Sequence, residues 1–341
     1  MPYNKFLNPM TEEEYAAEPY LKKLHDNFVE SGRTAPFTRG VARIALTEGC
    51  NYDCVFCHNE GMEGVSRQFD LDYLKTILDA YRDQIKSIKL VGGEPLLHKQ
   101  FDRAVDICNE IAPTSVTTNG SLIAKWALPL SKLKGVTVSV MSLKDRNYQE
   151  IMGTQSHVKA ALNSIERLVA AGTNVHINCV LTRQNQDEVE DIIETFSGIG
   201  VSEVKFLSIL EAKPGDAKLY VPLEGVGKRL EQKYGAPEVT GSTKVGFRVN
   251  ELTKAVLVYQ YCSVGCDVCK VEGFMRIDPL PALSYCLAAE PISIAEEAAK
   301  KDIAGLRAKL KLAMNGMGKP TGYTYKLEDR RKNPINTGLL P

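Results

Sequence analysis

The sequence has no long hydrophobic run, no signal-peptide pattern and no excess of charge of either sign. No stretch of the 341 residues reaches the roughly 18 apolar residues that a membrane span needs. Residues 1–24 lack the basic start and apolar core of a secretory leader. Lys and Arg together number 42, as do Asp and Glu, so the chain has no net field to attract nucleic acid. We therefore expect a cytoplasmic protein with neither membrane nor nucleic-acid partners.

Low-complexity segments are also absent, and the 44% of hydrophobic residues is ordinary for a globular protein. The length suits one large α/β unit, alone or with an appended domain. Because the cytoplasm keeps thiols reduced, nine cysteines indicate metal ligands before disulfides. Cys108 and Cys179 lie alone among apolar neighbours, as buried cysteines do. The other seven form two groups: Cys50, Cys54 and Cys57, and then Cys262, Cys266, Cys269 and Cys286.

Short β-rich runs alternate with amphipathic stretches from residue 41 onward. One helical stretch begins with Asp70 as a cap, and another ends on Gly172. Six such repeats predict a parallel sheet, either open or a partial barrel. The runs are rich in Val, Ile and Leu, as strands buried on both faces should be; they span residues 41–47, 88–93, 115–120, 136–142, 175–182 and 201–210.

Polar residues and glycines cluster where these runs end, which is where α/β folds place their active sites. The first cysteine group follows the first run, GGEP follows the second and TTNG ends the third. After residue 211 the repeat stops. There the sequence predicts two short strands and one long helix. The chain is therefore divided into an N-terminal extension (1–40), the β-α repeat unit (41–211) and a C-terminal region (212–341). The strands are expected at 244–250 and 255–262, and the helix at 293–316.

The first cysteine group places three thiols on one short loop with C-x3-C-x2-C spacing. Structural zinc sites usually close with four ligands, in paired C-x2-C knuckles. Three close cysteines without a local fourth suit an iron–sulfur cluster that leaves one iron open to a small molecule. A zinc knuckle is the alternative. His58 directly follows the group and is either a ligand or a solvated loop residue.

This spacing, with Phe56 before the third cysteine and GGEP after the second strand, resembles the radical S-adenosylmethionine (SAM) superfamily. The resemblance implies a partial (β/α)6 TIM barrel and a [4Fe-4S] cluster at Cys50, Cys54 and Cys57. It implies that one electron from the cluster cleaves SAM, and that the 5′-deoxyadenosyl radical then takes hydrogen from a substrate. The residues it assigns to SAM are Phe56, Gly92, Gly93, Glu94, Asn119, Ser139 and Asn178.

A closer resemblance, over roughly residues 38 to 315, is to the molybdenum-cofactor GTP cyclase (MoaA-like) family. That family also has a C-x2-C pair and a distant third cysteine, which hold an auxiliary cluster. The resemblance implies a C-terminal, twitch-like extension with a second [4Fe-4S] cluster at Cys266, Cys269 and Cys286, with or without Cys262. A fourth thiolate would leave no open iron for a substrate. Candidate substrate-binding residues are Arg43, Lys89, Lys205, Lys270 and Arg276.

The sequence departs from that family mainly at residues that bind triphosphate in the family. Its Asn-Arg-x-Arg run after the second auxiliary cysteine is replaced here by CKVEGFMRI, and its strand-six arginine by Lys205. The strand-five lysine that the family offers to the SAM carboxylate is His176 here. A lysine keeps the charge of an arginine but loses its bidentate fork. The C-terminal Gly-Gly of the family is also absent. We therefore expect the radical chemistry, on a small nucleotide- or nucleoside-like substrate that need not be GTP.

Two alternatives remain open. A peptide- or natural-product-modifying enzyme with an auxiliary cluster would need an N-terminal peptide-binding domain, and only about forty residues precede the first strand. A two-cluster electron-transfer protein would have no use for glycines beside an open iron. The enzyme would draw its electron from an external one-electron reductant of the flavodoxin or ferredoxin type.

Overall fold

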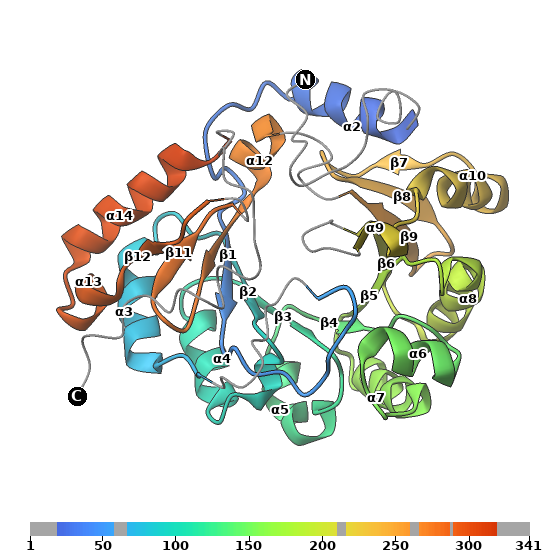
Figure 1. Ribbon diagram of the computed structural model, residues 1–341, viewed down its shortest axis with the longest axis horizontal. Coiled ribbons are helices and arrows are strands. Elements are labelled where there is room, and N and C mark those ends of the chain that lie inside the picture. Colours follow the sequence, from blue (N-terminus) through green and yellow to red (C-terminus); the bar gives the residue numbers. More distant parts are fainter. Residues whose placement is uncertain (1–18, 58–66, 210–215, 260–265, 287–288, 319–341) are drawn as a thin grey trace.

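The computed structural model describes residues 19–57, 67–209, 216–259, 266–286 and 289–318. A single sheet of twelve strands forms its centre and curves so that helices α3 to α8 cover its outer side (Figure 1). The strand order is β12-β11-β10-β1-β2-β3-β4-β5-β6-β9-β8-β7. Because β12 and β7 are edge strands, the sheet is not closed over the part of the chain described.

Six parallel strands form the middle of the sheet and confirm the predicted β-α repeat and partial barrel. Each strand overlaps its predicted run and pairs in parallel with the next one along the chain. The strands are β1 (Val41–Ala45), β2 (Ser87–Val91), β3 (Thr114–Thr118), β4 (Gly135–Ser139), β5 (Val175–Val180) and β6 (Glu203–Leu207).

Strands from the C-terminal third extend the same sheet at both edges. β9 pairs in parallel with β6, and β10 pairs in parallel with β1, so the barrel strands continue on either side. The predicted strands at 244–250 and 255–262 are present as β8 and β9. The bounds are β7 (Glu238–Val239), β8 (Lys244–Arg248), β9 (Lys254–Val258), β10 (Phe274–Ile277), β11 (Ala282–Ser284) and β12 (Ile292–Ser293).

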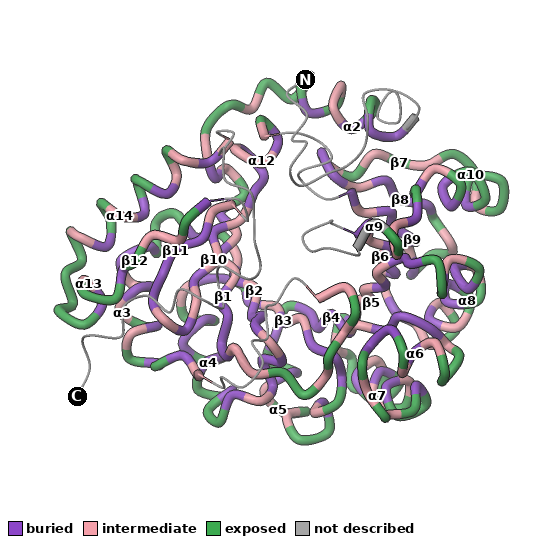
Figure 2. Tube along the Cα trace, viewed as in Figure 1, coloured by how far each residue is buried: buried purple, intermediate pink, exposed green. Residues whose placement is uncertain are grey.

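Helices cover the outer side because each presents an apolar stripe to the sheet, which Figure 2 shows as buried positions facing inward. Asp70 caps α3 as predicted, since its carboxylate accepts hydrogen bonds from the amides of Asp72 and Tyr73. The bounds are α2 (Pro19–Glu30), α3 (Leu71–Tyr81), α4 (Phe101–Asn109), α5 (Ala127–Ser131), α6 (Asp145–Met152), α7 (Val158–Ala170), α8 (Val189–Ile199), α9 (Asp216–Leu219), α10 (Leu223–Tyr234) and α12 (Cys266–Glu272), with short 3-10 turns η1 (Pro95–Leu97), η2 (Ile123–Trp126) and η3 (Gln186–Glu188).

The single helix predicted over 293–316 is wrong, because the structure has two helices there: α13 (Ala295–Ala299) and α14 (Ile303–Gly316). Lys301 takes a left-handed backbone conformation with φ of 54°, which ends the first helix. The Asp302 carboxylate then accepts a hydrogen bond from the Gly305 amide at 2.9 Å and starts the second. The helix-favouring composition hides this break, since Asp is also a strong N-cap.

The N-terminal segment spans the opening between the two edges of the sheet. α2 packs against β7 and β8 at one edge (Figure 1). Further along, Arg33 lies 2.7 Å from the Glu272 carboxylate at the end of α12, and the Phe37 amide donates to the Lys270 carbonyl at 2.8 Å. Ser242, just before β8, donates to the same Glu272 carboxylate at 2.9 Å. These contacts tie α12 to the opposite edge of the sheet.

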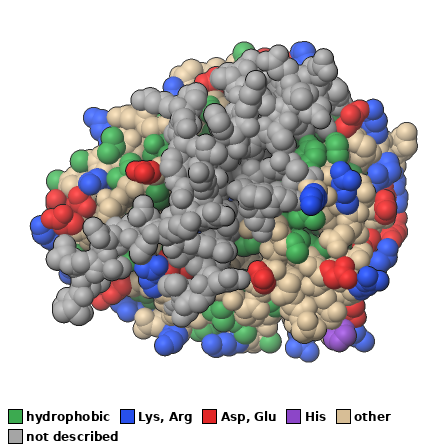
Figure 3. Space-filling view, in the orientation of Figure 1, with side chains coloured by type: hydrophobic (Ala, Val, Ile, Leu, Met, Phe, Trp, Pro, Cys, Tyr) green, Lys and Arg blue, Asp and Glu red, His purple; other side chains and the backbone are tan. Residues whose placement is uncertain are grey.

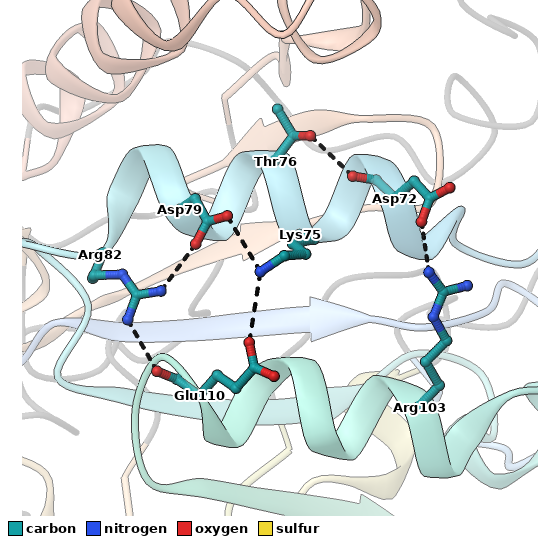
Figure 4. Close-up of polar contacts among 7 residues, drawn as sticks. All are labelled: Asp72, Lys75, Thr76, Asp79, Arg82, Arg103 and Glu110. Carbon is teal, nitrogen blue, oxygen red and sulfur yellow. Dashed lines mark hydrogen bonds and ion pairs between the residues drawn. The ribbon is translucent and has the colours of Figure 1, made fainter.

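The outer surface carries charge of both signs. On the face shown in Figure 3, the described basic and acidic side chains are interspersed around the rim. The ion pairs that link α3 to α4 and to the turn after α4 (Figure 4) are exposed, so each contributes about 0.2–1 kcal/mol at most. Among the described helices, none is long and apolar enough to cross a membrane.

Candidate active site

The loop with the first three cysteines follows β1 and docks on the end of α6. The Asp53 amide donates to the Gly153 carbonyl at 3.1 Å, and the Val55 amide donates to the Ile151 carbonyl at 3.0 Å. Gly153 has φ of 58°, and a Cβ there would lie 1.9 Å from the Asp53 carbonyl oxygen. A glycine is required at this position because the two backbones touch. The cysteine loop is therefore fixed from both β1 and α6.

The three thiols of this loop lie close enough to affect one another. Burial raises the pKa of Cys54, and the neighbouring Cys57 and Cys50 raise it further. Burial also raises the pKa of Cys50, and Glu94 and Cys57 add to this rise. Thiols that disfavour one another's ionisation need a cation to become thiolates together, so the donor set fits a metal cluster.

The arrangement also bears on the kind of metal group. Within the described ranges, no three Cys, His, Asp or Glu side chains are placed to hold one metal ion. A zinc ion requires its ligands to converge on one point. In an iron–sulfur cluster each thiolate binds a different iron, so three cysteines around one loop need not converge. His58 lies outside the described residues.

The glycines of GGEP allow the turn after β2 to pack against the cysteine loop. The Gly93 amide donates to the Thr47 carbonyl at 2.8 Å, and the Glu94 amide donates to the Gly49 carbonyl at 2.9 Å. A Cβ on Gly93 would lie 2.1 Å from the Gly49 carbonyl oxygen, and one on Gly92 would lie 2.4 Å from that of Thr47. Close approach between two loops thus requires these glycines, whatever ligand they also contact.

Glu94 is buried beneath this turn, with 1% of its surface exposed. Its carboxylate accepts hydrogen bonds from the Thr118 hydroxyl at 2.7 Å, the Asn119 amide at 2.7 Å and the Leu96 amide at 3.0 Å. Burial raises the pKa of Glu94 to about 7, and these donors oppose the rise. Glu94 therefore links the end of β2 to the end of β3. Its predicted contact with the SAM amine stays a prediction.

Asn119 ties the end of β3 to the cysteine loop. Its side-chain amide donates to Asn51 at 2.9 Å, and Asn51 in turn donates to Ser121 at 3.0 Å. Phe56 lies partly buried against the core at the same place. The structure thus brings together the cysteine loop, GGEP and TTNG, three segments that the sequence analysis placed at neighbouring strand ends.

Polar side chains line the face of the sheet turned away from the outer helices, called the inner face below. Alternate residues of the central strands lie on it, while their apolar neighbours are buried beneath the helices. Strand register places them side by side. The polar residues of the inner face include Arg43, Lys89, Ser115, Thr117, Thr137, Ser139, His176, Asn178, Glu203, Lys205, Lys244 and Arg276.

Two side-chain oxygens on the inner face lack a hydrogen-bond partner among the described residues. The side-chain oxygens of Asn178 and Thr117 are buried and have no hydrogen-bond partner among the described residues. Such groups are costly to bury unless a ligand or water completes them. Asn178 was predicted from the sequence and pairs in register with Ser139. Thr117 was missed, although strand alternation in TTNG puts it on the face opposite Thr118 and could have revealed it.

A compact charged group joins β5 and β6. Glu203 accepts from Lys205 at 2.6 Å and lies 2.9 Å from His176 Nδ1, which is 3.1 Å from the Lys205 ammonium. Burial opposes the ionisation of Glu203, but His176, Lys205 and Lys244 outweigh it and hold its pKa well below the usual range. Burial lowers the pKa of Lys205, and Glu203 offsets part of that shift. Glu203 was not identified from the sequence.

Lys89 faces other cations. Burial lowers its pKa to about 7, with further lowering by Arg43, Lys205 and Lys244 against a small opposing effect of Glu203. Arg43 is the register partner of Lys89 on the adjacent strand β1, whereas Lys205 and Lys244 come from the distant strands β6 and β8, so the curvature of the sheet brings these two near Lys89. Lys89 has neither an ion pair nor a side-chain hydrogen bond with any described residue. Such a cation is stabilised when an anion binds beside it.

Arg43 and Arg276 are neighbours in register on β1 and β10. The Arg43 guanidinium stacks on the Phe274 ring, with its carbon 3.6 Å from the ring centroid. Arg276 donates to Asp278 at 2.5 Å. Lys270, the remaining predicted substrate residue, lies on α12 rather than on the inner face.

The second cysteine group lies beyond the opposite end of β1 from the first. Cys266 and Cys269 are one turn apart on α12, which immediately precedes β10. Cys286 follows β11 and returns to the same end, since β11 runs antiparallel to β10. Burial raises the pKa of Cys266 and Cys286 raises it further, which indicates that the two thiols are close. Cys262 lies outside the described residues.

The sequence of this chain is similar to those of known proteins. The family model described as the Radical SAM superfamily matches residues 44–196. A probable GTP 3′,8-cyclase of Archaeoglobus fulgidus is 32% identical over 200 residues, which cover 56% of this chain and 66%, just under two thirds, of that relative. The GTP 3′,8-cyclase of Rhodopseudomonas palustris is 27% identical over 338 residues, which cover 90% of this chain and 94% of that relative.

Among solved structures, Streptococcus suis SuiB bound to S-adenosylmethionine matches with a TM-score of 0.61 at 17% identity, over 88% of this chain and 74% of SuiB. This likeness establishes the shared fold. The cysteine loop, the glycine turn that packs on it and the family match all agree. Residues 44–196 therefore match the radical SAM superfamily, and the chain is an enzyme of the radical SAM type that is similar to GTP 3′,8-cyclases.

Proposed function

We propose that this enzyme cleaves SAM reductively and uses the 5′-deoxyadenosyl radical to take hydrogen from a small phosphorylated nucleotide or nucleoside-like substrate. The observation that carries the proposal is Lys89 on the inner face. It is a cation without a described partner, surrounded by Arg43, Lys205 and Lys244. An anionic ligand would relieve this repulsion while Lys89 keeps its charge. The similarity to enzymes named for GTP supports a nucleotide.

In this proposal Cys50, Cys54 and Cys57 hold the cluster whose electron cleaves the C–S bond of SAM. Phe56, Gly92, Gly93 and Glu94 shape the SAM site at the ends of β1 and β2. The Asn178 and Thr117 oxygens face the ligands as acceptors, since no described residue donates to them. Asn119 and Ser139 contribute from the ends of β3 and β4.

The inner face then holds the substrate between the two cysteine groups. Arg43, Lys89, Lys205 and Arg276 offer cations there, whereas Lys270 would act from α12. We propose a second cluster at Cys266, Cys269 and Cys286, with Cys262 as a candidate fourth ligand. An external flavodoxin- or ferredoxin-type protein would supply the electron.

Anaerobic turnover tests the proposal. The enzyme, reductant and SAM are incubated with and without GTP or other nucleotides, and mass spectrometry detects 5′-deoxyadenosine and any altered nucleotide. We expect 5′-deoxyadenosine, with more formed when the true substrate is present. A rise with GTP and a GTP-derived product would identify a cyclase. Formation that no nucleotide changes would contradict a nucleotide substrate and point to a peptide or other natural product.

Anion binding should weaken as pH rises through about 7. Lys89 is a base whose pKa falls to about 7 in the folded protein. It is charged below that pH and neutral above it, so binding above pH 7 requires proton uptake. Sulfate is a suitable probe because its charge is constant from pH 6 to 9. We expect its affinity to fall by up to about tenfold per pH unit above 7.

Calorimetry in two buffers of different ionisation enthalpy would measure both the affinity and the proton uptake. Lys89→Met should weaken binding at pH 6 and flatten the pH profile. Lys132→Met is the matched control, since Lys132 pairs with Asp106 on the exposed surface. A wild-type profile that is already flat between pH 6 and 9 would refute the role of Lys89.

A further inference from the structure

Two of the cations on the inner face already form ion pairs with carboxylates. Lys205 lies 2.6 Å from Glu203, and their side chains are 13% and 21% exposed. Arg276 lies 2.5 Å from Asp278, with side chains 11% and 18% exposed. Both pairs are shielded from solvent, so each carboxylate neutralises its cation more effectively than a surface partner would.

These carboxylates are held from a second side as well. Glu203 also contacts His176 at 2.9 Å, across the β5–β6 pair. Asp278 accepts a hydrogen bond from the Ser284 hydroxyl at 3.2 Å, across the β10–β11 pair. A ligand phosphate that reached Lys205 or Arg276 would have to approach or displace an anchored anion. That approach is repulsive, so both carboxylates disfavour additional negative charge on the ligand.

Of the lysines on the inner face, Lys89 and Lys244 remain for a ligand. Neither has an ion pair or a side-chain hydrogen bond with a described residue. They come from β2 and from the start of β8, and Lys244 is near enough to disfavour the charged form of Lys89. A phosphate monoester carries a charge of about −1.5 to −2 at pH 7, which two lysines balance. A triphosphate would bring further charges toward Glu203 and Asp278.

We infer that the inner face accepts a ligand with a single phosphoryl group, and that Glu203 and Asp278 are specificity-determining residues that disfavour a triphosphate. This inference rests on the proposed function, since it concerns the substrate of the same site.

The test compares orthophosphate with tripolyphosphate by calorimetry on the reconstituted enzyme, under anaerobic conditions at pH 6.5 without added magnesium. We expect the wild type to bind tripolyphosphate no more tightly than orthophosphate. Glu203→Gln should increase the affinity for tripolyphosphate about tenfold, with a much smaller effect on orthophosphate. That increase corresponds to the removal of one repulsive contact. Asp278→Asn is a second variant, which tests the same inference if the Glu203→Gln protein does not fold.

Glu238→Gln is the matched control. Glu238 also contacts a lysine, Lys254, at 3.1 Å, but it is 57% exposed. It should leave the ratio of the two affinities unchanged. A wild type that prefers tripolyphosphate by tenfold or more would overturn this inference and leave the anionic substrate standing. If neither anion binds, the phosphorylated substrate itself is refuted, and this inference with it.

Discussion

Replacing Cys54 by Ala should abolish the formation of 5′-deoxyadenosine. Cys54 is the middle cysteine of the first group and the more deeply buried neighbour of Cys50, and its Sγ lies 3.5 Å from the Met152 carbonyl oxygen. Without it the loop offers two thiolates. Loss of an outer-shell partner alone costs about 10–100-fold in metal affinity or activity, so loss of a direct ligand should cost at least 100-fold.

The measurement combines iron and sulfide content with mass spectrometry of 5′-deoxyadenosine after anaerobic turnover. Cys108→Ala is the matched control, because Cys108 is a fully buried thiol in α4, outside both cysteine groups. It should keep its iron and its activity. If the Cys54→Ala protein still cleaved SAM at the wild-type rate, these three cysteines could not be the catalytic cluster site.

The second large effect is expected from one added methyl group, in Gly93→Ala. A Cβ at this position would lie 2.1 Å from the Gly49 carbonyl oxygen and 2.9 Å from the Cys50 amide nitrogen. Both atoms are backbone, so no side chain can rotate away. The cysteine loop must move, which should destabilise the fold by about 1–3 kcal/mol, as overpacking does, and disturb the first cluster.

Gly198→Ala is the matched control for this substitution. Gly198 lies in α8, and a Cβ there would meet nothing within 4 Å. Alanine favours a helix over glycine by about 1 kcal/mol, so this variant should be neutral or stabilised. Iron content and the free energy of unfolding would be measured for both. Full iron content together with unchanged stability in Gly93→Ala would show that the two loops are not in the contact described.

Local patterns predicted much of the fold. The six parallel strands and the Asp70 cap follow from the spacing of apolar residues and from capping chemistry, which act over a few residues. The prediction of a single helix over 293–316 was wrong for the same reason, since composition alone does not show that Asp302 starts a new helix. The glycines of GGEP were recognised, but the loop that they approach could not be, because Thr47 and Gly49 are some forty-five residues away in the chain.

The sequence by itself indicated an enzyme of the radical SAM type and the candidate cluster cysteines, because the cysteine motif and the glycine turn lie in short segments with fixed spacing. Only the tertiary structure decided what the substrate would meet. Strand pairing brought β9 and β10 into the same sheet and set Arg43 beside Lys89, and the curvature of the sheet brought Lys205 and Lys244 near them. The contact between Glu203 and His176 of the neighbouring strand arises there too. Electrostatic contacts act through space, so the charge of this face could be read only once the strands were assembled.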